Sequence, residues 1–152
     1  MATSTMFVMI STTAKYAMRA VVFLATNDTG FLNRAEIAKK TTVPHDYLLK
    51  VLNELDTAEI VESRRGPGGG YRLTRKSDQI TALDVILAVD DIPRIRKCPL
   101  GHSDHVNLCP LHKLLDDAGR MVEEAFAGVT VADLVPGRRR SESCDFPKQE
   151  ST

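Results

Sequence analysis

The fold of this chain is decided by residues 60–74, which read IVESRRGPGGGYRLT. The two ends of the stretch are rich in β-branched, aromatic and charged residues, as strands often are. The six residues between them contain four glycines and a proline, a composition that forms a turn. The stretch therefore predicts a β-hairpin over residues 60–64 and 71–74, with Arg64 and Arg65 at the entrance to its tip. A glycine-rich loop can also cradle a phosphate group, but the Gly-Lys-Ser or Gly-Lys-Thr motif and helix that such a site needs do not follow here.

Two short helices are expected immediately before this hairpin. Asn33 followed by Glu36 is a capping pattern that opens a helix over residues 34–40. Pro44 suits the first turn of a second helix, which we place over residues 44–56. The second helix would point one group of side chains into the core: Tyr47, Leu48, Val51, Leu52 and Leu55. It would leave another group facing outward: His45, Asp46, Leu49, Lys50 and Asn53.

This helix pair is typical of a helix-turn-helix, although amphipathic helix pairs also occur in proteins that do not bind DNA. The basic hairpin that follows favours DNA binding, because such a tip can lie along the phosphate backbone or insert an arginine into the minor groove. One more amphipathic helix is expected before the pair, over residues 12–26. Together these elements predict a winged helix-turn-helix domain over residues 9–80.

The rest of the chain is expected to hold a long helix. Thr81 and Asp84 cap a short helix over residues 82–89, and an irregular polar stretch follows it. Pro110 then opens a helix that reaches residue 127 and carries one apolar stripe: Leu111, Leu114, Leu115, Ala118, Val122, Ala125 and Phe126. The stripe could pack on its own domain, but we favour packing against a second copy. We therefore divide the chain after residue 80 into a sensor loop and dimerisation helix, residues 81–135, and a disordered tail, residues 136–152.

Composition excludes several classes of protein. The chain has 152 residues, of which 43% are hydrophobic and 26% charged, and it holds neither a run of about 18 apolar residues nor a signal-peptide pattern. We therefore expect a cytoplasmic protein without a membrane partner. Its net charge of zero divides into +3 over residues 1–80, −4 over residues 81–135 and +1 over residues 136–152, which suits a DNA-reading half and a separate sensing half. Three cysteines, an odd number, do not form a disulfide framework.

Three motifs together resemble a known family. They are RGPGGGY at residues 65–71, Lys-Tyr-Ala at residues 15–17 and Cys-Pro-Leu-His at residues 109–112. The chain resembles, from about residue 9 to residue 134, the iron–sulphur-responsive winged-helix repressors of the IscR/NsrR type. The resemblance implies a mostly α-helical fold with a small β-hairpin wing and a long C-terminal dimerisation helix. It also implies a bacterial, homodimeric repressor of transcription that binds imperfect palindromes in double-stranded promoter DNA.

The resemblance carries specific DNA-contacting positions over to this chain. It places Asp46 and Lys50 where the recognition helix reaches bases, and Arg65 where a wing arginine enters the minor groove. Lysine can donate to guanine O6 or N7 and aspartate can accept from cytosine N4, although phosphate contact or a solvated helix face is the alternative for both. Leu49 offers only an apolar contact at a further position. The complete set of expected DNA contacts is His45, Asp46, Lys50, Arg64, Arg65 and Tyr71.

The cysteines before and at the start of the long helix are candidate ligands. Their spacing alone, Cys98-x3-His102 and Cys109-x2-His112, suggests a structural Cys2His2 zinc site. The resemblance implies instead a 2Fe–2S cluster bound by Cys98, Cys109 and His112, since histidine can replace cysteine on an iron. The same cysteines could also form a thiol switch without a metal, or bind no ligand at all.

The chain departs from the family pattern at this site. Cluster-binding relatives commonly have three cysteines in the loop, and this chain has two. Lys15 occupies the position where other relatives supply a carboxylate ligand, and a protonated lysine is no substitute. The fourth ligand would have to come from His102, Asp104, His105 or a partner protomer. Cys144 lies in the charged tail and is expected to be incidental.

Two further hypotheses belong to different functional classes. A metal-dependent hydrolase would need an open coordination position and a general base in a cleft, and the sequence indicates neither. A cluster-carrying assembly protein without DNA contact would have no use for the basic wing. We therefore predict a transcription regulator that is not an enzyme and has no small-molecule substrate.

Overall fold

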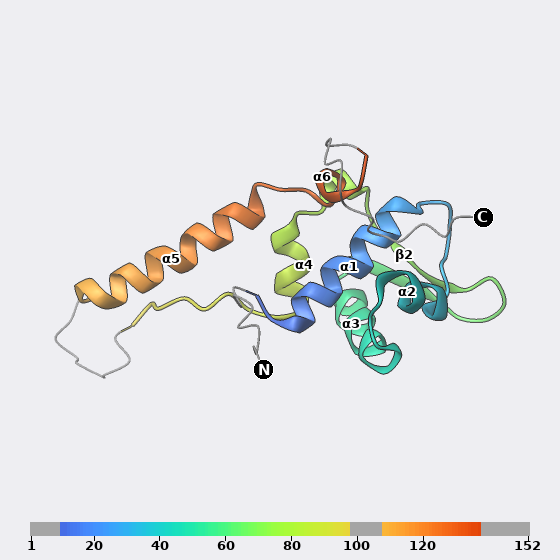
Figure 1. Ribbon diagram of the computed structural model, residues 1–152, viewed down its shortest axis with the longest axis horizontal. Coiled ribbons are helices and arrows are strands. Elements are labelled where there is room, and N and C mark those ends of the chain that lie inside the picture. The colour runs from blue at the N-terminus through green and yellow to red at the C-terminus, as the bar shows by residue number, and fades with distance from the viewer. Residues whose placement is uncertain (1–9, 98–107, 138–152) are drawn as a thin grey trace, which may run out of the picture.

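The computed structural model describes residues 10–97 and 108–137, and Figure 1 shows a helical body from which one long helix projects. The elements follow in the order α1 (Thr12–Thr26), α2 (Arg34–Thr41), α3 (His45–Thr57), β1 (Val61–Arg64), β2 (Gly70–Leu73), a 3-10 turn (Ser77–Gln79), α4 (Ala82–Val89), α5 (Pro110–Ala127) and α6 (Val131–Leu134). The expected class, mostly helical with a small hairpin wing, is confirmed. No helix within the described ranges is long and apolar enough to cross a membrane.

The main core lies among α1, α2 and α3. Small residues let α1 pack closely at its centre, where Ala17 and Ala20 are fully buried. The largest side chains that close the core are Ile37, Leu48, Leu52, Leu55, Ile60 and Ile80. Thr41 is the single buried polar residue in the described part of the chain, and its hydroxyl donates to the Ile37 carbonyl at 2.6 Å. This bond satisfies the hydroxyl, so its burial costs little.

Local capping chemistry sets the starts of α2 and α4 as the sequence predicts, and it also opens α6. The Asn33 side chain accepts from the Glu36 amide at 2.8 Å and opens α2. Thr81 with Asp84, and Thr130 with Asp133, form reciprocal capping boxes at the starts of α4 and α6.

The turn between α2 and α3 differs from what the sequence indicates. Pro44 does not lie in the first turn of α3 but is its N-cap, with ψ at 133°, so the helix begins at His45. Thr42 ends α2 in the left-handed region, with φ at 57° and ψ at 36°. A β-branched residue is strained there, because its Cβ crowds the backbone.

The prediction that Tyr47 points into the core is wrong. Its side chain is 37% exposed, while Leu48, Val51, Leu52 and Leu55 form the buried stripe of α3. Position 47 lies one residue beside that stripe and meets the start of α1 instead. There the Tyr47 hydroxyl hydrogen-bonds with the Thr13 hydroxyl at 2.7 Å, and its ring packs edge-on against Tyr16 at 5.4 Å. An exposed edge suits tyrosine, because its hydroxyl keeps a polar partner.

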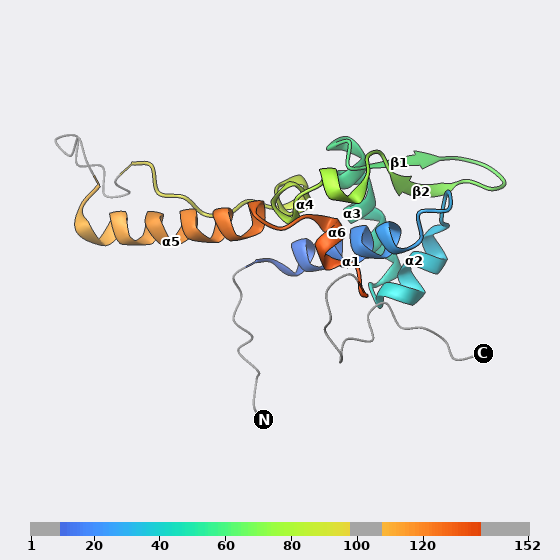
Figure 2. The ribbon, with the colours of Figure 1, turned by 90° about the horizontal axis from the view of Figure 1, so that it is seen from above.

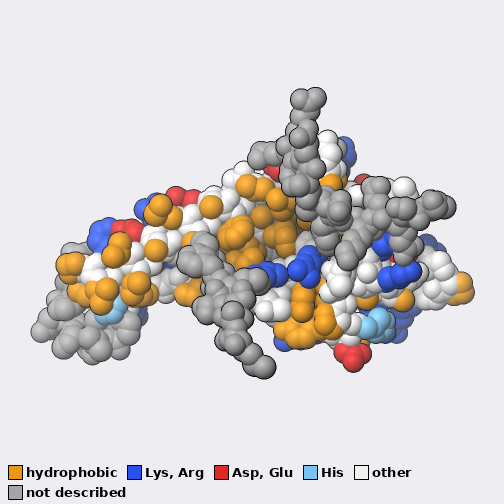
Figure 3. All heavy atoms as spheres, in the orientation of Figure 1, with side chains coloured by type: hydrophobic (Ala, Val, Ile, Leu, Met, Phe, Trp, Pro, Cys, Tyr) orange, Lys and Arg blue, Asp and Glu red, His pale blue; other side chains and the backbone are white. Residues whose placement is uncertain are grey.

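The apolar stripe of α5 is divided between two environments. Near the end of the helix, Val122 and Phe126 pack against Ala14, Ile86 and Ile92 of the body. The part nearer its start projects away from the body and keeps large apolar side chains exposed, at 62% for Leu111, 66% for Leu114 and 49% for Leu115. Met121, which directly precedes Val122, is also 64% exposed. Figure 3 shows hydrophobic side chains following α5 along one face. Packing on its own domain therefore applies near the end of the helix, and packing of the exposed part against a second copy stays a prediction.

Candidate nucleic-acid interface

Helix α3 presents the predicted reading face to solvent. His45, Asp46 and Lys50 are all exposed, and Leu49 is 37% exposed beside them. The Lys50 ammonium lies 3.9 Å from the Glu54 carboxylate and 5.9 Å from the centre of the Tyr47 ring. These are weak surface contacts, so Lys50 can leave them for another partner at small cost.

The hairpin exposes Arg64 and Arg65 in different settings. Val61 pairs with Leu73, Glu62 with Arg72, Ser63 with Tyr71 and Arg64 with Gly70. Alternation along the strands puts Val61 and Tyr71 on the core side and Arg64 on the outer side. Arg65 begins the turn itself and is exposed. Figure 2 shows this hairpin projecting from the body at the end away from α5.

Glycines shape the turn and its attachment. Gly66 and Gly68 have φ at 88° and 71°, where residues with a side chain are strained. A Cβ on Gly70 would lie 2.1 Å from the Leu32 carbonyl oxygen, so that position admits only glycine. The close approach lets Leu32 and Tyr71 exchange two backbone hydrogen bonds of 2.9 and 2.8 Å.

The bridge between Leu32 and Tyr71 is not predicted from the sequence. It places the Phe31 ring beside the wing, 4.6 Å from the guanidinium carbon of Arg72 and 5.8 Å from that of Arg64. The available signal was two adjacent apolar residues, Phe31 and Leu32, directly after a turn. Tyr71, predicted to touch DNA, is partly buried against the core, and its DNA contact stays a prediction.

The candidate ligands are only partly described. Cys109 is the N-cap residue of α5, and its Sγ lies 3.2 Å from Nδ1 of His112 on the first turn. Tetrahedral Zn–S and Zn–N bonds would separate two such atoms by about 3.5 Å, so the pair fits two ligands of one metal ion. Cys98, His102, Asp104 and His105 lie outside the described residues. No group of three or more candidate ligands occurs within residues 10–97 and 108–137.

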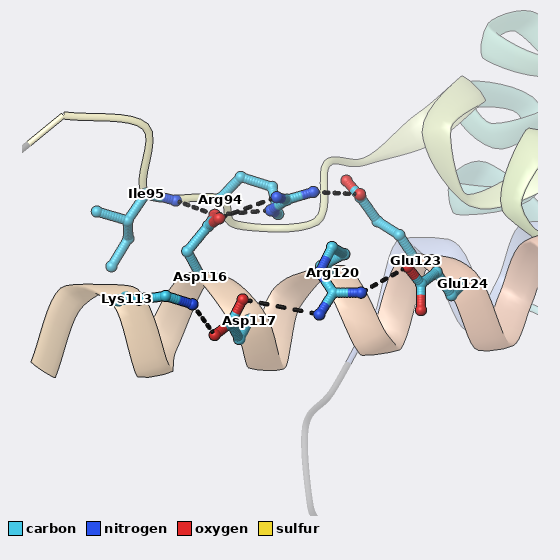
Figure 4. A network of polar contacts seen from close by, with 8 residues as sticks. All are labelled: Arg94, Ile95, Lys113, Asp116, Asp117, Arg120, Glu123 and Glu124. Carbon is cyan, nitrogen blue, oxygen red and sulfur yellow. Dashed lines mark hydrogen bonds and ion pairs between the residues drawn. The ribbon is translucent and has the colours of Figure 1, made fainter. Parts of the chain in front are cut away.

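The segment that leads to Cys98 is fixed along α5 by a partly buried ion-pair network, drawn in Figure 4. The Arg94 guanidinium donates to both Asp116 carboxylate oxygens at 2.7 and 3.0 Å and to Glu123 at 2.6 Å. The Ile95 amide donates to the same Asp116 carboxylate at 3.0 Å. The Arg94 hydrogen bonds, reinforced by the Ile95 amide, lower the pKa of Asp116 to about 2, and the two carboxylates raise the pKa of Arg94.

Close packing fixes the same segment a second time. A Cβ on Gly119 would lie 2.6 Å from the Pro93 carbonyl oxygen, so the helix needs glycine where the segment crosses it.

On the solvent side of α5, the hydrogen bond from Lys113 lowers the pKa of Asp117, and the bond to Glu124 raises the pKa of Arg120. Helix α5 is thus polar along one side and apolar along the other.

Known proteins match this arrangement. Residues 10–137 match the profile of the Rrf2 family, described as iron-dependent transcriptional regulators. The chain belongs to the Rrf2 family. Its members are regulators of transcription that bind DNA and are not enzymes.

Individual Rrf2 relatives cover most of the chain. A putative helix-turn-helix regulator of Aquifex aeolicus is 33% identical over 129 residues, which is 82% of this chain and 90% of the relative. The regulator IscR of Sodalis glossinidius is 33% identical over 128 residues, 83% of this chain and 78% of the relative.

Solved structures share the fold. IscR of T. potens superposes with a TM-score of 0.72 at 22% identity, covering 89% of this chain and 91% of that one. CymR, the global cysteine regulator of B. subtilis, gives a TM-score of 0.69 at 27% identity, covering 82% and 94%.

Proposed function

We propose that this Rrf2 regulator is a homodimeric repressor that binds a promoter palindrome and responds to a 2Fe–2S cluster. The observation that carries the DNA-binding part is the exposed reading face of α3 beside a basic glycine-rich hairpin. Lys50 would leave Glu54 and donate to a guanine, and Asp46 would accept from a cytosine. His45 at the helix start would add a contact to the same half-site.

The wing would contact the backbone and the minor groove. Arg65 at the turn has no ion-pair partner among the described residues and would enter the narrow groove. Arg64, on the outer strand face, would bind a phosphate, and Tyr71 would add a contact at the wing base. These contacts position the protein, whereas those of α3 select the sequence.

The dimer part rests on the exposed stripe of α5. Four large apolar residues on a projecting helix need a cover, and a second copy related by a two-fold axis covers both stripes at once. Such a dimer places two reading heads on two half-sites, as a palindrome requires. The division into residues 9–80, 81–135 and 136–152 remains a prediction.

The sensing part rests on the contact between Cys109 and His112. We place these two residues and Cys98 around a 2Fe–2S cluster, which supplies an oxidant-sensitive centre when bound. Arg94, Asp116 and Gly119 hold one end of the loop on α5, so a change in the loop acts on the dimerisation helix. The same Cys109–His112 contact also fits zinc, which is the second candidate.

Variants that each remove one positive charge distinguish contacts with DNA bases from contacts with the DNA backbone. Duplexes selected from a random pool by the wild type serve as probes. Arg65→Ala should weaken binding by about 1–3 kcal/mol, and Lys50→Ala should relax preference at one position in each half-site. Lys113→Ala, on the projecting end of α5, removes the same charge away from the interface and should bind normally. Arg65→Ala and Lys113→Ala binding alike would remove the wing from the interface.

The cluster is tested by anaerobic purification with iron, sulphide and zinc analysis. Wild type should carry iron and sulphide in equal amounts, Cys98→Ala should lose them, and Cys144→Ala should keep them. A colourless wild type that stays colourless after reconstitution would contradict the cluster. Stoichiometric zinc in its place would support the Cys2His2 site.

A further inference from the structure

The outer face of the wing carries an aromatic residue that no DNA-contact prediction includes. The hairpin register sets Glu62 directly opposite Arg72. The antiparallel bridge between Leu32 and Tyr71 lies on the other edge of β2 and sets Phe31 on the other side of Arg72. Phe31, Arg72 and Glu62 therefore form one row across the two strands and the bridged segment beside β2, and alternation puts Arg64 on the same face.

The two arginines on this face, Arg64 and Arg72, make different contacts. The Arg72 guanidinium lies over the Phe31 ring at 4.6 Å and also donates its Nε–H to the Glu62 carboxylate. Its charge is therefore matched by a carboxylate. The Arg64 guanidinium reaches the same ring at 5.8 Å and makes no ion pair with any residue in the described ranges. The Arg64 guanidinium thus contacts the Phe31 ring and has no carboxylate partner among the described residues.

We infer that Phe31 is a positioning residue of the DNA interface, holding the Arg64 guanidinium ready for a backbone phosphate. An arginine on a flexible side chain loses rotamer freedom when it binds, and a ring that already restricts the side chain reduces this loss. The ring attracts the cation without neutralising it, unlike a carboxylate, so the full charge remains for the phosphate. The inference rests on the proposed DNA-binding function.

Arg65 provides a natural comparison within the same wing. It follows Arg64 directly, has the same charge and is exposed, but of these two arginines only Arg64 lies over the Phe31 ring. Loss of the ring should therefore weaken the contribution of Arg64 and leave that of Arg65 unchanged.

The experiment is a set of double-mutant cycles measured on duplexes selected by the wild type. Phe31→Leu keeps an apolar side chain and should weaken binding about two- to fivefold for each protomer on the duplex, the range of an exposed cation–π contact. Phe31→Tyr keeps the ring and should restore wild-type affinity. Phe31→Leu should have no further effect in an Arg64→Ala background and its full effect in an Arg65→Ala background. Thermal unfolding of each single variant should match the wild type, because Phe31 is only partly buried.

Each outcome bears on the inference. Wild-type affinity in Phe31→Leu, or an equal loss in both arginine backgrounds, would overturn it while leaving DNA binding intact. A loss that Phe31→Tyr fails to restore would also overturn it, because that result would indicate shape rather than the ring. If the wild type selects no duplex at all, the proposed function itself fails.

Discussion

Truncating one exposed leucine of α5 should weaken the proposed dimer by an amount that the structure allows us to work out. Complete burial of a leucine side chain contributes about 1.5–3 kcal/mol. Leu114 is 66% exposed in the single chain, so a partner can bury about two thirds of that, roughly 1–2 kcal/mol per copy. A two-fold axis buries the residue twice, which doubles the loss for Leu114→Ala to roughly 2–4 kcal/mol per dimer.

This loss converts to a measurable shift in association. Since about 1.4 kcal/mol is a factor of ten, the dimer dissociation constant should rise roughly 30- to 700-fold. Alanine favours helix at least as strongly as leucine, so α5 itself should remain intact. Leu115, 49% exposed, should show the same trend with a smaller loss for Leu115→Ala, and Leu115→Glu should yield monomers or insoluble chains.

Sedimentation over a dilution series from micromolar to nanomolar concentration measures the change. Lys113→Ala on the polar side of α5 is the matched control, because it removes a long side chain that is 66% exposed. Equal dissociation constants for Leu114→Ala and Lys113→Ala, or a wild type that is monomeric at micromolar concentration, would refute a dimer built on this stripe.

Three further predictions concern the turn and the loop anchor. Thr42→Gly should raise the free energy of unfolding by about 0.5–1 kcal/mol in chemical denaturation, because it removes the strain of a β-branched residue in the left-handed region at some cost in chain entropy. A lower denaturation midpoint would contradict this. Gly119→Ala should loosen the segment that crosses α5, although alanine is the better helix former, and hydrogen exchange of the Ile95 amide should become faster. Gly128→Ala is the control, because its Cβ would meet nothing closer than 3.5 Å, and it should leave that exchange unchanged. Because the pKa of Asp116 is lowered to about 2, its ion pair with Arg94 stabilises the anchor above about pH 4 and is lost as the pH falls toward 2. The NMR chemical shift of the Ile95 amide, which donates to Asp116, should therefore titrate with a midpoint near 2. A midpoint near 4 would contradict the network.

Local chemistry explains what the sequence predicts well. Asn33 and Thr81 cap helices through residues three positions away, so the pattern can be read along the chain. The glycine-rich turn is equally local, because its backbone angles require glycine wherever the rest of the chain lies. The recognition face of α3 follows from the spacing of Leu48 and its buried neighbours.

Non-local contacts explain what the sequence does not predict. The pairing of Leu32 with Tyr71 joins segments nearly forty residues apart, and neither segment contains a sequence pattern that indicates its partner. Arg94 meets Asp116 and Glu123 across the loop, where charges of both signs are common and no spacing rule applies. The periodicity of α5 likewise predicts an apolar side, but not that Val122 and Phe126 pack on the body while Leu114 stays exposed.

The measurement that tests the central claim most directly is the salt dependence of binding between wild-type protein and a duplex it has selected. A dimer that places Arg64 of each protomer on a backbone phosphate neutralises at least two phosphates, so the logarithm of the binding constant should fall against the logarithm of salt concentration with a slope of roughly −1.8 or steeper. The complex should contain two chains per duplex, and Arg64→Ala should reduce the slope by roughly 1.8. A slope near zero, or binding that does not distinguish the selected duplex from a scrambled one, would contradict a sequence-specific regulator that reads DNA through α3 and the wing.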